Sequence, residues 1–178
     1  MASARIGGMR SHSSEILVVG GGPAGAAAAA WAARAGREVT VLDAEVFPRD
    51  KPCGDGLTPR AVKELGALGL DSWLAEKPRN VGLRAAGFGQ ELLLPWPGGS
   101  LPAHGSAVPR TELDARILQV ARESGATVHE GTAAVDVEMD GDRLAVVVAQ
   151  RGDEYISYRA QRVIVADGAR SQLGRKLG

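Results

Sequence analysis

The chain has 178 residues, enough for one domain of ordinary size with one hydrophobic core. Lys and Arg together number 21, as do Asp and Glu, so the formal net charge is zero, which argues against a nucleic-acid partner. A single cysteine excludes an internal disulfide and favours a reducing compartment such as the cytoplasm. No apolar run is long enough to span a lipid bilayer.

The chain is predicted to begin with a leader. Residues 1–13 hold basic side chains but no apolar stretch, so they do not form a secretory signal peptide. We expect this leader to be flexible and the folded part to comprise residues 14–178.

A strand, a helix and a second strand are predicted next, at about residues 15–20, 23–36 and 38–43. The sequence ILVVGGGPAG places three glycines there with G-x-G-x-x-G spacing. Gly20 permits a tight turn, Gly22 lets the backbone approach a pyrophosphate, and Gly25 lets the helix lie close to the strand. The helix begins with Pro23 and Ala24, and its N-terminus offers unpaired N–H groups to phosphates.

The second strand ends in Asp43, which is placed to hydrogen-bond the ribose of adenosine. Glu45, two residues further on, is the competing candidate for this role. A carboxylate here disfavours NADP, because it would meet the 2′-phosphate. The strand–helix–strand context therefore predicts a dinucleotide-binding unit in a Rossmann-like α/β fold, rather than a glycine-rich packing turn without a ligand.

Two further helices are predicted. One begins at Thr58-Pro59, because threonine caps a helix and proline suits its first position, and ends at Gly69. The other opens with a capping box from Thr111 to Asp114. Its core face has helical spacing and consists of Leu113, Ile117, Val120 and Ala121.

The remaining segments are predicted to be short strands and loops. Apolar runs on either side of Gly87-Phe88-Gly89 predict a hairpin, whereas residues 95–107 are rich in Pro and Gly and are expected to be loop. Strands are expected near residues 126–130, 132–139, 143–150, 155–159 and 163–166. The last of them is expected to return to the parallel sheet. Insertions thus interrupt the Rossmann-like core, and the segment at about 80–107 is expected to begin an inserted antiparallel substrate domain.

Three motifs resemble those of a known family. Phe47–Val62, with the sequence FPRDKPCGDGLTPRAV, resembles the signature loop of the geranylgeranyl reductases, FAD-dependent enzymes that saturate isoprenoid double bonds. Val108–Ile117 and Val163–Gly178 resemble two motifs beside the flavin in the larger superfamily, which also contains aromatic hydroxylases. The chain is most similar to the actinobacterial members that hydrogenate one isoprene unit of menaquinone. Because family chains are much longer, the resemblance implies an N-terminal fragment without the C-terminal catalytic half, inactive by itself.

The resemblance implies FAD as the cofactor and adds residues to its site. Arg110 is expected to reach the pyrophosphate through a charge-assisted contact, although without the resemblance it would be interpreted as a solvated arginine. Asp167 and Gly168 follow the last strand, at the sheet edge where such cofactors bind. The resemblance also places a loop beside the flavin ring and the substrate, which consists of Lys51, Pro52, Cys53, Gly54, Asp55 and Gly56.

Cys53 is the candidate proton donor of this loop. Its thiol either gives a proton to the substrate or shapes the pocket, and the alternative is a free cysteine without a chemical role. Arg49 and Lys51 either screen the charge of the cofactor or are solvated, as charged loop residues usually are. No metal site is expected, because no metal-ligand spacing connects Cys53 with the histidines His12, His104 and His129.

The implied reaction is the two-electron reduction of an isolated alkene, with hydride from reduced FAD and a proton from an acid. The implied partners are an isoprenoid lipid, the membrane surface, where the protein would be peripheral at the inner face, and an electron donor. The sequence leaves that donor open among NAD(P)H, ferredoxin and deazaflavin. Two other functions also stay open: an FAD-dependent aromatic hydroxylase or halogenase, and a non-catalytic dinucleotide-binding module.

Overall fold

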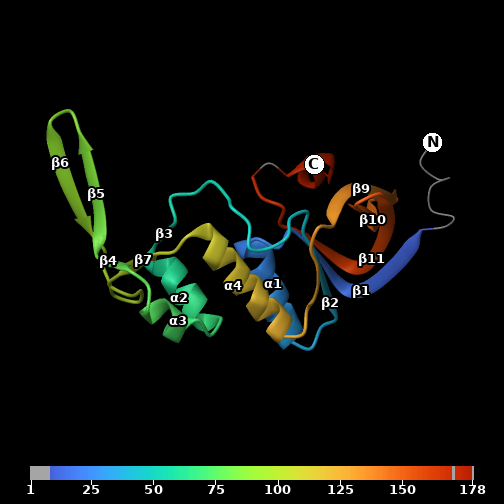
Figure 1. Cartoon of the computed structure of the whole chain (residues 1–178), viewed down its shortest axis with the longest axis horizontal. Helices are drawn as coiled ribbons and strands as arrows, with labels where there is room; N and C mark the ends of the chain where they lie inside the picture. Colours follow the sequence, from blue (N-terminus) through green and yellow to red (C-terminus); the bar gives the residue numbers. More distant parts are fainter. Residues whose placement is uncertain (1–8, 170, 178) are drawn as a thin grey trace. The chain divides into compact units, whose positions relative to one another are not determined.

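Figure 1 shows the computed structural model of the chain, which describes residues 9–169 and 171–177. These residues form two units. The first comprises the chain up to Arg49 and from Asp114 onward, and the second comprises Asp50–Leu113.

The first unit is built on one six-stranded sheet. Its strands, in spatial order, are β8 (Thr127–His129), β2 (Val39–Leu42), β1 (Arg10–Val19), β11 (Glu154–Val165), β10 (Arg143–Arg151) and β9 (Ala133–Asp140). The strands β8, β2, β1 and β11 are parallel to one another, whereas β11, β10 and β9 form an antiparallel meander. The last predicted strand therefore does return to the parallel sheet, where Val163 pairs with Leu17. This arrangement confirms the predicted Rossmann-like α/β fold.

Helix α1 (Pro23–Arg34) connects β1 to β2 and packs closely because its buried residues are small. These residues are Gly25, Ala26, Ala29 and Ala30. The helix gives way to Gly36, whose φ of +77° suits a glycine and whose N–H bonds to the carbonyl of Ala33 at 2.9 Å. Helix α4 (Arg110–Glu123) buries all four residues of its predicted core face. A short helix, α5 (Gln172–Leu177), follows β11.

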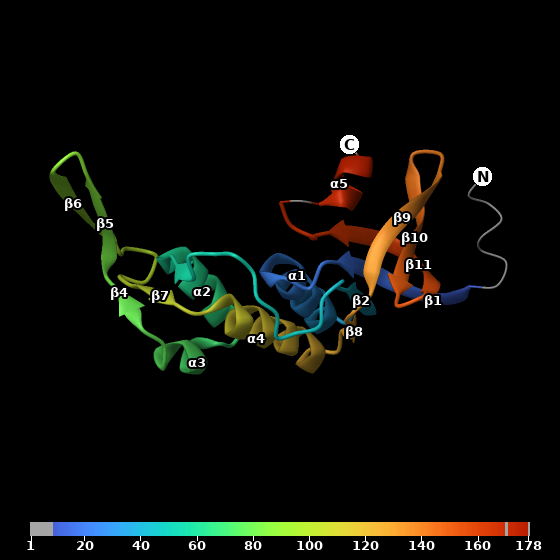
Figure 2. The same ribbon diagram turned by 45° about the horizontal axis from the view of Figure 1, so that its top comes forward.

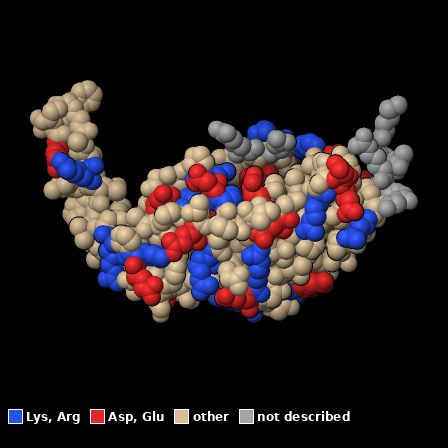
Figure 3. Space-filling model, viewed as in Figure 1, with Lys and Arg blue, Asp and Glu red and all other residues tan. Residues whose placement is uncertain are grey.

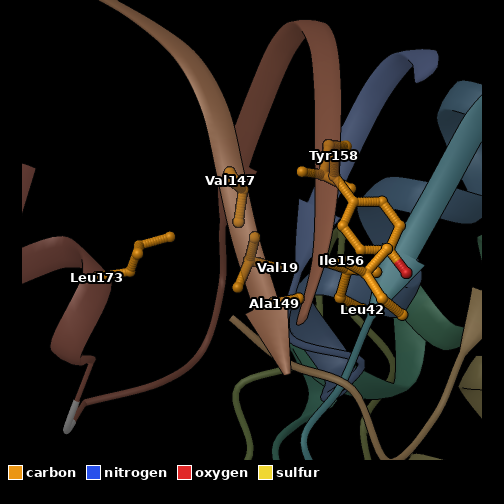
Figure 4. Packing of buried hydrophobic residues seen from close by; sticks show 8 residues of the cluster. Val19, Leu42, Val147, Ala149, Ile156, Tyr158 and Leu173 are labelled. Atoms are coloured by element: carbon orange, nitrogen blue, oxygen red, sulfur yellow. The ribbon is translucent and has the colours of Figure 1, made fainter. Parts of the chain in front are cut away.

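One buried cluster of the first unit lies against β1, β10 and β11. It consists of Leu17, Val19, Leu42, Val147, Ala149, Ile156, Tyr158 and Leu173. Figure 4 shows Leu173 pointing from α5 toward Val147 and Val19. Full burial of each large aliphatic side chain contributes about 1.5–3 kcal/mol.

The second unit contains two helices, a small sheet and a hairpin (Figure 2). Its elements are α2 (Pro59–Ala67), α3 (Asp71–Ala75), a sheet of β3 (Gly56–Leu57), β7 (Gly105–Ala107) and β4 (Arg79–Asn80), and the hairpin of β5 (Gly82–Gly87) and β6 (Gln90–Pro95). The hydroxyl of Thr58 accepts a hydrogen bond from the Ala61 N–H at 3.4 Å, so Thr58 caps α2 as predicted.

The hairpin is confirmed and is unusually apolar at its surface. Its strands pair from Gly82 opposite Pro95 to Gly87 opposite Gln90. Four of its leucines are exposed, namely Leu83, Leu92, Leu93 and Leu94. Phe88, in the turn, is fully exposed and has a left-handed φ of +51°. The hairpin's charged side chains, Arg84 and Glu91, form an ion pair at 2.7 Å, and the rest of its surface is uncharged in Figure 3.

The predicted start of the first strand is wrong. Strand β1 begins at Arg10, so the last residues of the expected leader pair with β11, from Arg10 opposite Ile156 onward. The segment RSHSS has no alternation of apolar residues, so its sequence does not predict a strand. Backbone pairing with β11 and the stacking of His12 on Tyr158 hold this extension instead. Residues 1–8 of the expected leader lie outside the described residues.

Three other element predictions need correction. The strands expected near 155–159 and 163–166 are one continuous strand, β11, because pairing with β1 carries it through a polar stretch. Residues 105–107 of the expected loop form β7, which lies between β3 and β4. Helix α4 begins at Arg110, whose N–H donates to the carboxylate of Asp55 at 3.2 Å. Asp114, a member of the predicted capping box, pairs with Arg49.

Candidate functional site

The turn between β1 and α1 can be made only with glycine at two of its positions. Gly20 has a φ of +103°, and a Cβ there would stand 2.6 Å from the carbonyl carbon of Ala166. A Cβ at Gly25 would overlap the carbonyl oxygen of Gly20. By contrast, a Cβ at Gly22 would meet only Arg49 Nη2, at 3.6 Å. The backbone is thus crowded behind the turn, while the space in front of Gly22 is bordered by a cationic group.

The N-terminus of α1 has the features of an anion site. Gly22 is its N-cap and makes no side-chain hydrogen bond, Pro23 occupies the first turn, and that turn holds no acidic residue. The first N–H groups of a helix lack intrahelical partners and carry a partial positive charge. A phosphate in front of Gly22 would therefore find both the helix N-terminus and a guanidinium.

Asp43 is fixed between the glycine turn and the neighbouring strand. Its Oδ2 accepts a hydrogen bond from the Gly21 N–H at 2.6 Å, and its Oδ1 accepts one from the Glu45 N–H at 2.8 Å. Its backbone N–H donates to the carbonyl of His129 at 3.1 Å. An ionised carboxylate has about four acceptor positions, so Asp43 retains capacity for ribose hydroxyls. Glu45 is exposed, and the geometry favours Asp43 over it.

Arg49 is not the solvated loop residue that the sequence left open. Its Nη1 lies 2.8 Å from Oδ2 of Asp114, and the two side chains are only 14% and 0% exposed. Its guanidinium carbon also lies 4.8 Å from the centre of the Phe47 ring. These contacts hold the guanidinium beside Gly22.

Two buried side-chain atoms near this turn lack hydrogen bonds within the described part of the chain: Arg49 Nη1, despite its ion pair, and Asp167 Oδ1. Arg49 borders Gly22, and the Cα of Asp167 lies 2.8 Å from the position that a Cβ at Gly20 would take. Gly168, the next residue, has a left-handed φ of +92°. Buried polar atoms without partners are rare, so the unpaired acceptor of Asp167 at this turn fits a ligand that donates a hydrogen bond.

The predicted flavin loop lies in the second unit and is tied to the start of α4. The carbonyl of Asp55 accepts from the Val108 N–H at 3.0 Å, and its carboxylate accepts from the Arg110 N–H at 3.2 Å. Asp55 itself has a left-handed φ of +55°. Gly56 pairs with Ala107 in the small sheet. The other residues of the loop are exposed: Lys51, Pro52, Cys53 and Gly54.

Cys53 is a free, exposed cysteine whose surroundings favour the thiolate. A hydrogen bond from the backbone of Asp55, followed by one from the Arg110 side chain, lowers the pKa of the thiol below its ordinary value. The structure thus brings three predicted residues together, Cys53, Asp55 and Arg110. The expected contact of Arg110 with a pyrophosphate stays a prediction.

Sequence reasoning missed the role of Asp114 and left that of Arg49 undecided. Asp114 had a usable signal: it precedes Ile117, Leu118 and Ala121 at helical spacing and so falls on the apolar stripe of α4. A carboxylate on such a stripe needs a buried partner. Arg49 offers no comparable signal, because its partner is far away along the chain.

A family model described as an FAD binding domain matches residues 13–178. This chain belongs to that family. FAD, the cofactor predicted from the sequence, is therefore its cofactor, and the crowded glycine turn with the unpaired acceptor of Asp167 fits that group.

The chain is also similar to named proteins. It is 57% identical to a menaquinone reductase of Mycobacterium tuberculosis, over 93% of this chain and 40% of that protein. It is 28% identical to a digeranylgeranylglycerophospholipid reductase of Picrophilus torridus, over 92% of this chain and 41% of that protein. The solved structure of CmlS, a flavin-dependent halogenase, matches with a TM-score of 0.84 and 31% identity, over 94% of this chain and 31% of the halogenase. The chain thus spans less than half the length of each of these proteins.

Two properties of the described residues concern metals and membranes. Within residues 9–169 and 171–177, no group of three or more His, Cys, Asp or Glu side chains is arranged to hold a metal ion. In the same ranges, none of the helices has the length and apolar character needed to cross a bilayer.

Proposed function

We propose that this chain is the FAD-binding part of a reductase that saturates a double bond in an isoprenoid lipid, the side chain of menaquinone first among them. The 57% identity to a mycobacterial menaquinone reductase carries this proposal, because it extends over 93% of the chain. The more distant similarity to an archaeal reductase of geranylgeranyl lipids supports the same reaction class.

The first unit would hold the adenosine diphosphate half of FAD. The N-terminus of α1 and the Arg49 guanidinium face the space proposed for the pyrophosphate, and Asp43 accepts from the ribose hydroxyls. Asp167 Oδ1, which has no hydrogen-bond partner among the described residues, would accept a hydrogen bond from a hydroxyl of the cofactor's ribityl chain. When bound and reduced, FAD supplies hydride.

Cys53 is the proposed proton source for the other carbon of the double bond. Asp55 and Arg110 lower the pKa of its thiol, so that it releases a proton more readily but is protonated over a narrower range of pH. This role therefore predicts activity that falls as the pH rises through the pKa of the thiol. Its serine variant, which keeps a hydroxyl but not the acidity, is expected to lose the activity that depends on proton transfer.

A halogenase or hydroxylase is the second candidate, favoured by the structural match to CmlS. The fold is common to both reaction classes, so the fold does not separate them. The higher identity to the menaquinone reductase favours the reductase. Consumption of oxygen coupled to product formation would decide for the second candidate.

Mass spectrometry of the isoprenoid quinones tests the proposed substrate. Deletion of the gene in its source organism is expected to replace the hydrogenated quinone with one that is lighter by one H2, and complementation is expected to restore it. An unchanged quinone pool would refute this substrate and direct attention to other prenyl lipids. Supplying NAD(P)H, ferredoxin or a deazaflavin in turn to the purified full-length protein would identify the electron donor, and co-sedimentation with vesicles would test peripheral membrane binding.

A further inference from the structure

The buried ion pair between Arg49 and Asp114 has a specific geometry that packing alone does not require. We propose that Asp114 is a positioning residue, which acts through Arg49 to hold its guanidinium against the FAD pyrophosphate. This inference rests on the proposed position of the pyrophosphate in front of Gly22.

Arg49 needs an external restraint to keep one orientation. It follows β2 in a stretch without helix or strand, and a long flexible side chain there would lose conformational entropy on being fixed. Asp114 Oδ2 holds Nη1 at 2.8 Å, while Nη2 is the atom nearest to the Cβ position of Gly22, at 3.6 Å. One edge of the guanidinium is thus occupied by the carboxylate, and the other borders the space in front of the turn.

A second contact restrains the guanidinium of Arg49. The Phe47 ring lies 4.8 Å from its central carbon, and the Phe47 N–H donates to Glu130 Oε1 at 2.8 Å. Glu130 in turn pairs with Arg122 of α4 at 2.6 Å. Phe47, which contacts the Arg49 guanidinium, is therefore linked through Glu130 to α4, the helix that carries Asp114.

Burial of the Asp114 carboxylate costs desolvation free energy, which a purely structural role does not require. The Asp114 side chain is 0% exposed and lies on the apolar stripe of α4, where an apolar residue would avoid the desolvation of a charge. Replacement of a buried ion pair by apolar side chains is often neutral or stabilising. Orientation of Arg49 toward an anion explains why a carboxylate stands there.

The charges also explain how the pair would act. Arg49 and Asp114 nearly neutralise one another, so the pair attracts a distant anion weakly. Its contribution lies in a preorganised N–H edge at short range, which a planar guanidinium offers and an ammonium does not. Loss of Asp114 removes the orientation but leaves the positive charge.

Titration of FAD into the 178-residue chain, followed by the change in flavin fluorescence, tests the inference. Asp114→Ala is expected to raise the Kd of FAD about 10- to 100-fold, the range for one lost charge-assisted hydrogen bond. Asp114→Asn, which keeps an acceptor oxygen beside the Arg49 guanidinium, is expected to stay within about 3-fold of the parent chain. Glu15→Ala, which removes a half-buried carboxylate 3.5 Å from Arg37 in the same unit, is the matched control and is expected to leave the Kd unchanged.

A double-mutant cycle separates positioning from a general structural role. If Asp114 acts through Arg49, the Asp114→Ala change has no further effect on the Kd in an Arg49→Ala background. The phosphorus NMR signals of bound FAD are expected to move in Asp114→Ala and to stay in place in Asp114→Asn. Circular dichroism confirms that each titrated variant is folded, and if Asp114→Ala is not, the same cycle is run with Asp114→Leu, which fills the site but cannot bind Arg49.

The outcomes are distinct. An unchanged Kd in folded Asp114→Ala, or an equal loss with and without Arg49, would overturn the positioning role while leaving the cofactor in place. Phosphorus signals that stay in place in the Arg49 variant would overturn it as well. Failure of the parent chain to bind FAD would instead refute the proposed cofactor position itself, and the inference with it.

Discussion

Replacement of Gly25 by alanine tests the tight packing of the glycine turn. An alanine inside a helix ordinarily stabilises by about 0.5–1 kcal/mol relative to glycine. At Gly25 the added Cβ would overlap the Gly20 carbonyl oxygen and stand 3.0 Å from its carbon. Non-bonded carbon atoms prefer about 3.5–4.0 Å, so the contact with the carbon alone requires α1 to move by about 0.5–1 Å, and the overlap with the oxygen requires more. Because both obstructing atoms are backbone, no rotamer change relieves the overlap.

The expected loss follows from these terms. Overpacking of a core costs about 1–3 kcal/mol, and an obstruction by backbone belongs at the upper end. The gain in helix propensity offsets part of this cost. Gly25→Ala is therefore expected to lower the free energy of unfolding by about 2 kcal/mol. For a chain of this size that loss lowers Tm by about 4–8 °C, and FAD affinity is expected to fall with it because the turn shifts.

Gly66→Ala in α2 is the matched control. Its Cβ would stand 3.1 Å from the carboxyl carbon of Asp71, but that carboxylate belongs to a flexible, exposed side chain that can rotate away. The same gain in helix propensity should therefore leave Gly66→Ala as stable as the parent chain or slightly more stable. Thermal unfolding followed by circular dichroism measures both variants. A Gly25→Ala chain that melts at or above the parent Tm would refute the packing argument.

Three further predictions concern other features of the chain. The rate of Cys53 alkylation by iodoacetamide is expected to rise with pH around a midpoint below that of an ordinary cysteine, and Arg110→Ala should move this midpoint upward; an unmoved midpoint would contradict the role of Arg110. Burial, followed by the positive charges of His12 and Arg151, lowers the pKa of His129. The folded state therefore favours the neutral ring and loses stability as the pH falls below about 6.5, where the imidazole of the unfolded chain takes up a proton. In His129→Gln, Tm should therefore drop less between pH 7.5 and pH 5 than in the parent chain. Phe88→Asn relieves a left-handed φ and removes an exposed aromatic ring, so it is expected to raise Tm slightly and to reduce light scattering, whereas increased scattering would count against this account.

The parts of the fold that could be predicted are those that depend on neighbouring residues. The strand, the glycine turn and α1 form one local pattern, and the Thr58 cap and the Phe88 turn are local as well. Strand β7 could not be predicted, because three residues become a strand only through pairing with β3 and β4. The extension of β1 from Arg10 likewise depends on β11, from the other end of the chain.

The candidate site divides in the same way. Its glycines and Asp43 follow from local spacing, whereas its ion pair and its capping contact join distant residues. Asp55 lies 55 positions before Arg110, and the sequence offered a nearer candidate cap in Thr111. Arg49 and Asp114 become neighbours only when α4 packs in the first unit. Their pairing was therefore hidden until the tertiary structure was known.

Asp167 shows how this site trades stability for binding. Its Oδ1 is buried without a hydrogen-bond partner among the described residues, which costs about 1–3 kcal/mol in the absence of ligand. Asp167→Ala removes that cost and should raise the Tm of the FAD-free chain by about 2–12 °C. The same change removes an acceptor for a cofactor hydroxyl and should weaken FAD binding about 10-fold.

Asp167→Ala is thus expected to raise the Tm of the FAD-free chain and to weaken FAD binding, and these two effects can be measured separately. At FAD concentrations about 100 times Kd, binding adds about 2.7 kcal/mol to the stability of the parent chain. The parent chain should therefore gain more Tm from FAD than Asp167→Ala does, although it starts lower. If Asp167→Ala instead melted below the parent chain without FAD, Asp167 would be a structural residue whose carboxylate already has its partners. Because a stabilising change that weakens a ligand marks a residue kept for binding, the two melting curves together assign Asp167 to the cofactor or to the fold.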